Sequence, residues 1–112
     1  MSISLSVALV FGVEITNRAA MRRVQDVCES HATVEAWPVG DHESLVVFPR
    51  VSHTSLANGT HDVSEPVFDV DAAMHSPQVV TARWCVEVHD VMTAAGVVGV
   101  DAPRWLVVCN AR

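Results

Sequence analysis

The chain has 112 residues, half of them hydrophobic, and is therefore long enough to bury the core of one domain without a metal or a disulfide. This composition excludes intrinsic disorder, and the formal net charge of −6 excludes a general binder of nucleic-acid backbones. All seven basic residues are arginines, and valine supplies 23 residues. We therefore expect a single domain over residues 1–112.

The opening apolar run, residues 3–15, has the hydrophobicity of a secretion signal but not its charge pattern. The first basic residue, Arg18, follows the run, whereas a signal peptide carries its positive charge first. No run approaches the roughly 18 consecutive apolar residues of a membrane-spanning helix. Cys28, Cys85 and Cys109 form no C-x-x-C pair and are expected to be buried, reduced thiols. These features predict a cytoplasmic protein without a membrane segment.

Residues 3–15 alternate with a period of two, which predicts a strand with one buried face. Large apolar side chains occupy the odd positions. The side chains at the even positions are mostly small, so this second face is expected to be exposed to solvent or covered by a partner. Thr16 or Asn17 is a suitable cap for an amphipathic helix that continues to His31.

Two short strands are expected next, Thr33–Trp37 and Ser44–Val51, joined into a hairpin. The second is apolar on both faces, which is typical of a central strand. Residues 52–76 are more polar and are interpreted as an insertion. Within it, Asn58-Gly59 predicts a hairpin turn, because both residues tolerate a positive φ.

Ser76 is expected to cap a second helix that begins with Pro77 and ends at Ala95, before Gly96. A closing strand follows over Arg104–Asn110. The element order β-α-β-β-α-β is that of the split βαβ, or ferredoxin-like, arrangement. The sequence therefore predicts an α+β fold with an antiparallel sheet, two helices on one face and an insertion before the second helix.

Three arginines, Arg18, Arg22 and Arg23, occupy the first half of the first predicted helix. The helix dipole favours acidic side chains there, so this placement breaks a local rule and indicates a binding site. Arginines at a helix N-terminus bind phosphates or acidic partners. The alternative is a solvated helix face.

The second predicted helix carries apolar side chains opposite its core stripe. Val79, Ala82 and Val86 lie there at helical spacing, roughly opposite Trp84. Such a face is covered by a partner, or it reflects the abundance of valine in this chain. We take it as a candidate partner surface and expect a homodimer.

Histidine and aspartate gather in and beside the insertion, where His53, His61, Asp62 and His75 are candidate ligands for zinc or a similar ion. Their spacing matches no known ligand pattern, and surface loop histidines are the alternative. His31 is expected to cap the end of the first helix, where the dipole favours a positive charge.

The chain opens with alternating serines over Met1–Val7, continues with Val10–Ile15 and closes with Pro103–Val108. These two ends resemble small accessory proteins of tailed bacteriophages, whereas the middle of the chain does not. The resemblance implies a protein that acts in the host cytoplasm by binding and inhibiting a host protein, including defence proteins. It carries over no site residue.

The leading hypothesis is a non-enzymatic protein-binding module without a cofactor, acting as a homodimer on a host or viral protein. One alternative is a protein that sequesters a nucleotide or another small ligand with the three arginines. Another is a small metal-dependent hydrolase with its ligands in the insertion.

Overall fold

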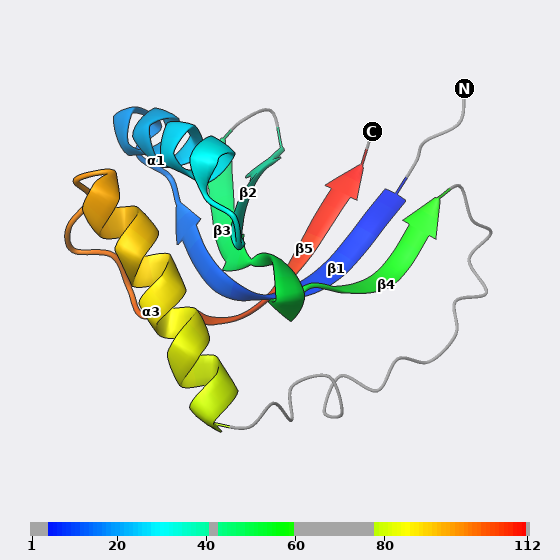
Figure 1. Ribbon diagram of the computed structural model, residues 1–112. Coiled ribbons are helices and arrows are strands. Elements are labelled where there is room, and N and C mark those ends of the chain that lie inside the picture. Colours follow the sequence, from blue (N-terminus) through cyan, green and yellow to red (C-terminus); the bar gives the residue numbers. More distant parts are fainter. Residues whose placement is uncertain (1–4, 41–42, 60–77, 112) are drawn as a thin grey trace.

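The computed structural model describes residues 5–40, 43–59 and 78–111, which form an antiparallel sheet and two α-helices (Figure 1). In chain order the elements are β1 (Leu5–Ile15), α1 (Arg18–Ser30), β2 (Val34–Val39), β3 (Ser44–Pro49), the 3₁₀ turn η1 (Arg50–Ser52), β4 (Thr54–Gly59), α3 (Gln78–Ala94) and β5 (Arg104–Ala111). β2 pairs with β3, β3 pairs with β1, and β1 pairs with both β4 and β5. The α+β class is confirmed, and the ends of the correctly predicted elements differ from expectation by one or two residues.

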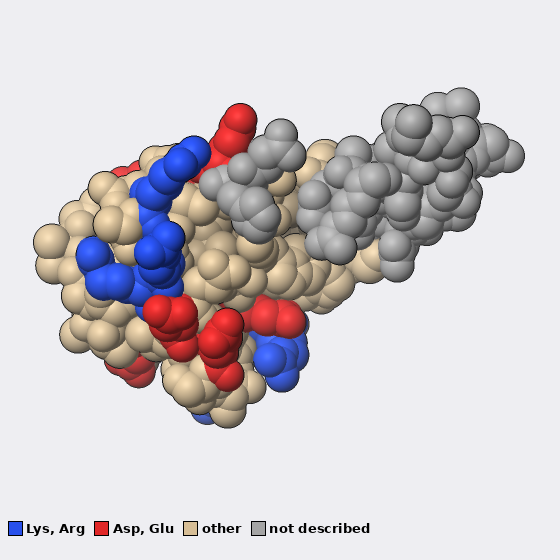
Figure 2. All heavy atoms as spheres, turned by 90° about the horizontal axis from the view of Figure 1, so that it is seen from above, with Lys and Arg blue, Asp and Glu red and all other residues tan. Residues whose placement is uncertain are grey.

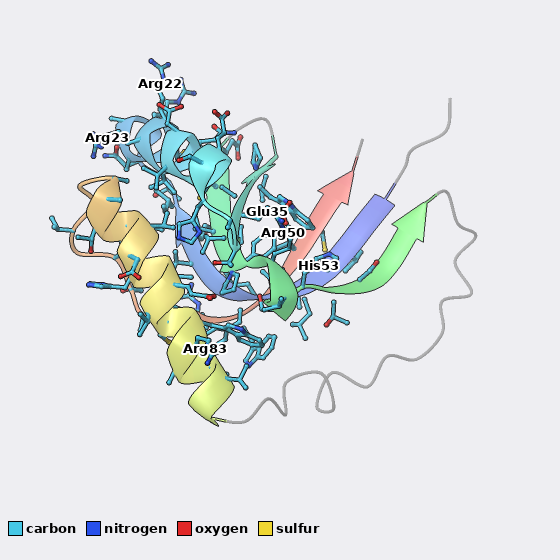
Figure 3. The ribbon with its side chains drawn as sticks, in the orientation of Figure 1. Arg22, Arg23, Glu35, Arg50, His53 and Arg83 are labelled. Carbon is cyan, nitrogen blue, oxygen red and sulfur yellow. The ribbon has the colours of Figure 1, made fainter. Side chains whose placement is uncertain are left out.

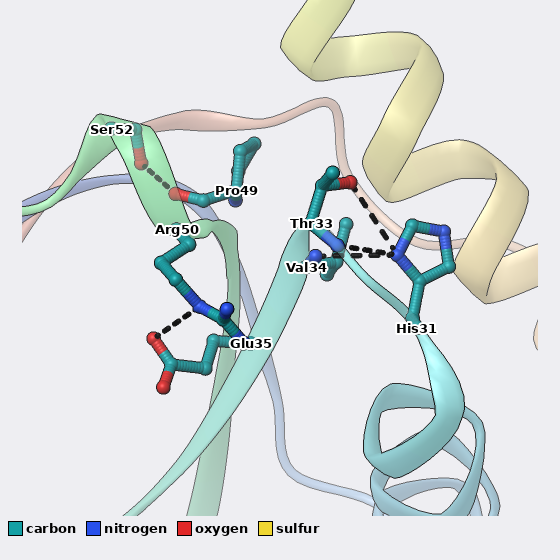
Figure 4. Close-up of polar contacts among 7 residues, drawn as sticks. All are labelled: His31, Thr33, Val34, Glu35, Pro49, Arg50 and Ser52. Carbon is teal, nitrogen blue, oxygen red and sulfur yellow. Dashed lines mark hydrogen bonds and ion pairs between the residues drawn. The ribbon is translucent and has the colours of Figure 1, made fainter.

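β1 is the centre of the sheet. Its first part, Leu5–Leu9, pairs with β4 on one edge and with β5 on the other, and its last part, Val13–Ile15, pairs with β3. Between these parts the backbone N–H of Phe11 donates to Ser52 Oγ (3.1 Å). The Ser52 hydroxyl donates in turn to the carbonyl oxygen of Pro49 (2.8 Å; Figure 4). η1 thus lets the chain pass from β3 to β4 along β1 without leaving the buried Phe11 donor unpaired.

The turn predicted at Asn58-Gly59 is wrong, because both residues belong to β4 and pair with the start of β1. A turn here would leave the first part of β1 without this neighbour. Pairing with a strand far away in the sequence therefore overrides the local turn preference. Of the predicted insertion, residues 54–59 form a strand, and the part beyond Gly59 lies outside the described residues.

Both faces of β1 are buried over residues 8–13, although the sequence pattern left its second face exposed to solvent or open to a partner. On one face, Val13 and Ile15 belong to a core cluster that joins α1 and α3 to the sheet. On the other, Val10 packs with Phe48 and Val108 in a second cluster. The sheet curls so that β2 and β5 approach each other over this second face. At Ala8, Val10 and Gly12 the small-residue face of β1 is therefore covered within the chain itself.

Gly12 lies where β1 comes closest to β3. A Cβ atom at this position would collide with the carbonyl oxygen of Val47 and lie 2.9 Å from the Cβ atom of Phe48. Glycine is the residue that permits so close an approach of two strands.

The two helices begin and end on the signals expected of them. The Asn17 side chain accepts a hydrogen bond from the first turn of α1 (3.0 Å), as predicted. After α3, Gly96 has a φ of 71°, and the N–H of Val97 donates to the carbonyl oxygen of Met92 (2.9 Å). The core stripe of α3 buries Trp84, Val88, Val91 and Met92, and Ala95, just beyond the end of the helix, is buried as well.

Candidate functional site

A groove of about 750 Å³ runs between α3 and the segment 96–103 that follows it. The lining is mainly apolar, and the helix contributes Cys85, Val86, Val88, His89, Met92 and Thr93. Exposed valines stand on both walls: Val86 of α3 is 59 % exposed and Val98 of the segment is 92 % exposed. A hollow of this size and character is typical of a binding site.

The segment 96–103 takes this path because two glycines turn it. Gly96 and Gly99 have φ values of 71° and 75°, which side chains other than glycine rarely adopt. Val97 packs against the core cluster beneath the helices, whereas the next residue, Val98, stays in solvent. The second wall of the groove therefore presents an apolar side chain outward.

The partner surface predicted on the second helix lies beside this groove. Ala82 and Val86 are exposed, and Val86 lines the groove. Val79 also belongs to α3, but its side chain lies outside the described residues. Sequence reasoning missed the opposite wall, although its run of glycines and valines, residues 96–100, was an available signal.

The three arginines predicted to bind a partner are exposed on α1, and one of them has a structural partner. Nε of Arg23 donates to the carbonyl oxygen of Ala95 (3.0 Å), just beyond the end of α3. A basic side chain there satisfies a free carbonyl group and suits the helix dipole. Arg22 extends away from the fold (Figure 3). Among the described residues, neither Arg18 nor Arg22 has a hydrogen bond or an ion pair.

Acidic side chains lie directly beside basic ones on the face seen from above (Figure 2). Nucleotide phosphates are negatively charged and bind most strongly where the surrounding side chains are all positive. The mixed charge on this face, together with the engagement of Arg23, gives the nucleotide hypothesis no added support.

The metal hypothesis finds one of its four residues in the described part of the chain. The ring of His53 lies against Trp37 (centroids 5.0 Å apart) and Phe48 (6.3 Å), so it belongs to an aromatic group. The other three predicted ligands, His61, Asp62 and His75, lie outside the described residues. Within residues 5–40, 43–59 and 78–111 no three His, Cys, Asp or Glu side chains are placed to hold a metal ion.

His31 stands at the end of α1, as predicted, but it acts there as an acceptor. Its Nδ1 accepts hydrogen bonds from the backbone N–H groups of Thr33 (3.3 Å) and Val34 (3.2 Å; Figure 4). A ring nitrogen that accepts hydrogen bonds carries no proton. His31 therefore closes the turn into β2 through this nitrogen, which was not the role expected from the helix dipole.

A second cavity, of about 520 Å³, lies beside another face of α3. It is lined by Thr33, Val51, Val80, Arg83, Trp84 and Glu87. Oε2 of Glu87 is shielded from solvent and has no hydrogen-bond partner among the described residues.

The cysteines differ in accessibility more than expected. Burial raises the pKa of the Cys28 thiol to about 11, so its reactive thiolate is scarce at neutral pH. Cys85 is half-buried in the groove wall. Cys109 is exposed on β5, which corrects the expectation that all three are buried.

No protein-family model, curated protein or solved structure matches this chain. Neither α1 nor α3, the helices of the described residues, has the length and apolar character needed to cross a membrane. The groove beside α3 is thus the candidate site on geometric grounds.

Proposed function

We propose that this chain is a non-enzymatic protein-binding module that acts as a homodimer through α3 and the adjoining groove. The observation that carries the proposal is the pair of exposed valines, Val86 and Val98, on the two walls of an apolar groove. Apolar side chains concentrated around a hollow are typical of protein–protein contacts.

The favoured occupant of the groove is a second copy of the chain. A two-fold interface uses the same patch on both copies, so the patch must complement itself. This one carries a protruding valine next to an apolar hollow, and opposite charges at Arg83 and Asp90 around Val86. The second face of the sheet, where such domains also pair, is filled by the chain's own side chains.

We further propose that the fold is a variant of the ferredoxin-like arrangement. β3 lies between the strands that α1 connects, β1 and β2, which supports a split βαβ unit. β1 lies between β5 and the β3–β4 stretch, as the second unit requires. In this proposal β4 is an addition that extends β3 along β1.

The partner class rests on the chain ends. The resemblance of these ends to accessory proteins of tailed bacteriophages favours a host or viral protein in the cytoplasm as the partner. The formal net charge of −6 suits a basic surface on that partner.

Light scattering of the purified chain tests the dimer. We expect about twice the mass of one 12.1 kDa chain. Val86→Asp and Val98→Asp should each shift the chain to a monomer, because burying a carboxylate in an apolar contact is costly.

Val107→Asp is the matched control for these two variants. Val107 on β5 is 57 % exposed, nearly the same fraction as Val86, and it lines neither the groove nor the second cavity, so its replacement should leave the dimer intact. A monomeric wild type, or a dimer unchanged by both groove variants, contradicts the proposal.

A further inference from the structure

The outer face of α3 carries opposite charges on one flank of Val86. Arg83 lies three residues before Val86 and Asp90 four residues after it, and all three side chains are exposed. Seven residues fall only about 20° short of two helical turns, so Arg83 and Asp90 lie on the same flank. The charges therefore form a positive end and a negative end along a single line.

Neither charge has a partner among the described residues. The ion pairs found there, Glu35–Arg50 and Asp101–Arg104, do not involve α3. Arg83 projects from the first half of the helix (Figure 3) and forms no ion pair with Glu87, four residues further along. Both Arg83 and Asp90 are thus available to a second molecule.

An antiparallel pair of α3 helices uses both charges at once. With a two-fold axis at Val86, Arg83 lies about 4.5 Å to one side and Asp90 about 6 Å to the other, at 1.5 Å per residue. Reversing the second helix brings its Asp90 to within about 1.5 Å of Arg83 along the axis. A two-fold parallel pair would place the charged flank of each helix against the Ala82 and His89 flank of the other, so Arg83 and Asp90 would not meet.

We propose that two copies pair α3 against α3 in antiparallel orientation, with Val86 at the two-fold axis and two Arg83–Asp90 ion pairs between the copies. This inference rests on the proposed function and adds its orientation and register. The other flank of Val86 carries Ala82 and His89, so no acidic side chain opposes another there.

Charge reversal in the full-length chain tests the register by sedimentation velocity. Arg83→Glu creates two acidic contacts between the copies and Asp90→Arg creates two basic ones, so each should raise the dimer Kd about tenfold. The double variant R83E/D90R restores opposite charges and should return Kd to within about twofold of wild type.

Arg22→Glu is the control, because it reverses an exposed arginine on α1 and should leave Kd unchanged. Thermal unfolding of each variant shows whether it is folded. Where a reversal prevents folding, Arg83→Gln or Asp90→Asn replaces it and should weaken the dimer by a smaller factor.

The outcomes separate the register from the dimer itself. A higher dimer Kd in each single variant, together with a Kd near that of the wild type in the double variant, supports the antiparallel register. A dimer that Val86→Asp breaks, but that neither charge reversal weakens, overturns the register and leaves the proposed function standing. A monomeric wild type overturns both.

Discussion

Gly12 shows how much of this fold depends on one atom. Its missing Cβ leaves room for the carbonyl oxygen of Val47, which is a backbone atom and cannot rotate away. We expect Gly12→Ala to lower the free energy of unfolding by about 3 kcal/mol, since overpacking forces the strands apart. Urea denaturation followed by circular dichroism measures this loss.

Gly99→Ala is the comparison, because Gly99 has open space around it but a φ of 75°. Its cost is backbone strain alone, about 1 kcal/mol. Equal losses in the two variants would show that close packing at Gly12 is not what excludes a side chain.

The thiol of Cys28 makes the free energy of unfolding pH-dependent in the alkaline range. Burial raises its pKa from 9.0 to about 11, so the folded chain holds a proton that the unfolded chain releases in this range. The resulting stabilisation is complete below pH 9.0 and is lost as the pH rises towards 11. Lysine and tyrosine are absent, so few other side chains titrate there.

We expect the free energy of unfolding of the wild type to fall more steeply over this range than that of Cys28→Ala. Cys109→Ala removes an exposed thiol and should follow the wild type. Parallel curves for wild type and Cys28→Ala would show that folding does not raise the pKa of this thiol.

Among the elements, α1 and α3 are linked by a hydrogen bond that the arginine pattern alone did not reveal. Arg23 on α1 donates to the carbonyl oxygen of Ala95 at the end of α3. Arg23→Gln should lower the free energy of unfolding by about 1 kcal/mol in denaturation experiments. Arg22→Gln should change it little, because Arg22 has no partner among the described residues. Equal losses would assign the effect to charge and not to this bond.

The elements that the sequence predicts correctly are those with local signals. Alternation marks β1, the Asn17 side chain caps α1, and Gly96 ends α3. β4 was missed because its Asn58-Gly59 pair is a strong turn signal. In the folded chain these two residues pair with the start of β1, and this long-range pairing outweighs the local turn preference. The groove was half predicted: Val86 follows from helical spacing, but the wall around Val98 depends on how the chain folds back.

Across the whole molecule, apolar side chains are divided between two internal clusters and one external groove. The clusters fill both faces of the curled sheet. Among the described residues, the large exposed apolar side chains are Val51, Val86, Val98 and Val107. Two of these four flank the groove, which is why the groove, and not the face of the sheet, is the surface to test for self-association.

The closed second face of the sheet also has a consequence for how association responds to concentration. Because Val10 is fully buried by its own chain, separating two copies uncovers none of this cluster. The monomer then keeps its core, and the proposed dimer exchanges subunits without unfolding. Its population then follows the amount of protein by mass action, so dilution alone should shift the proposed dimer towards monomer.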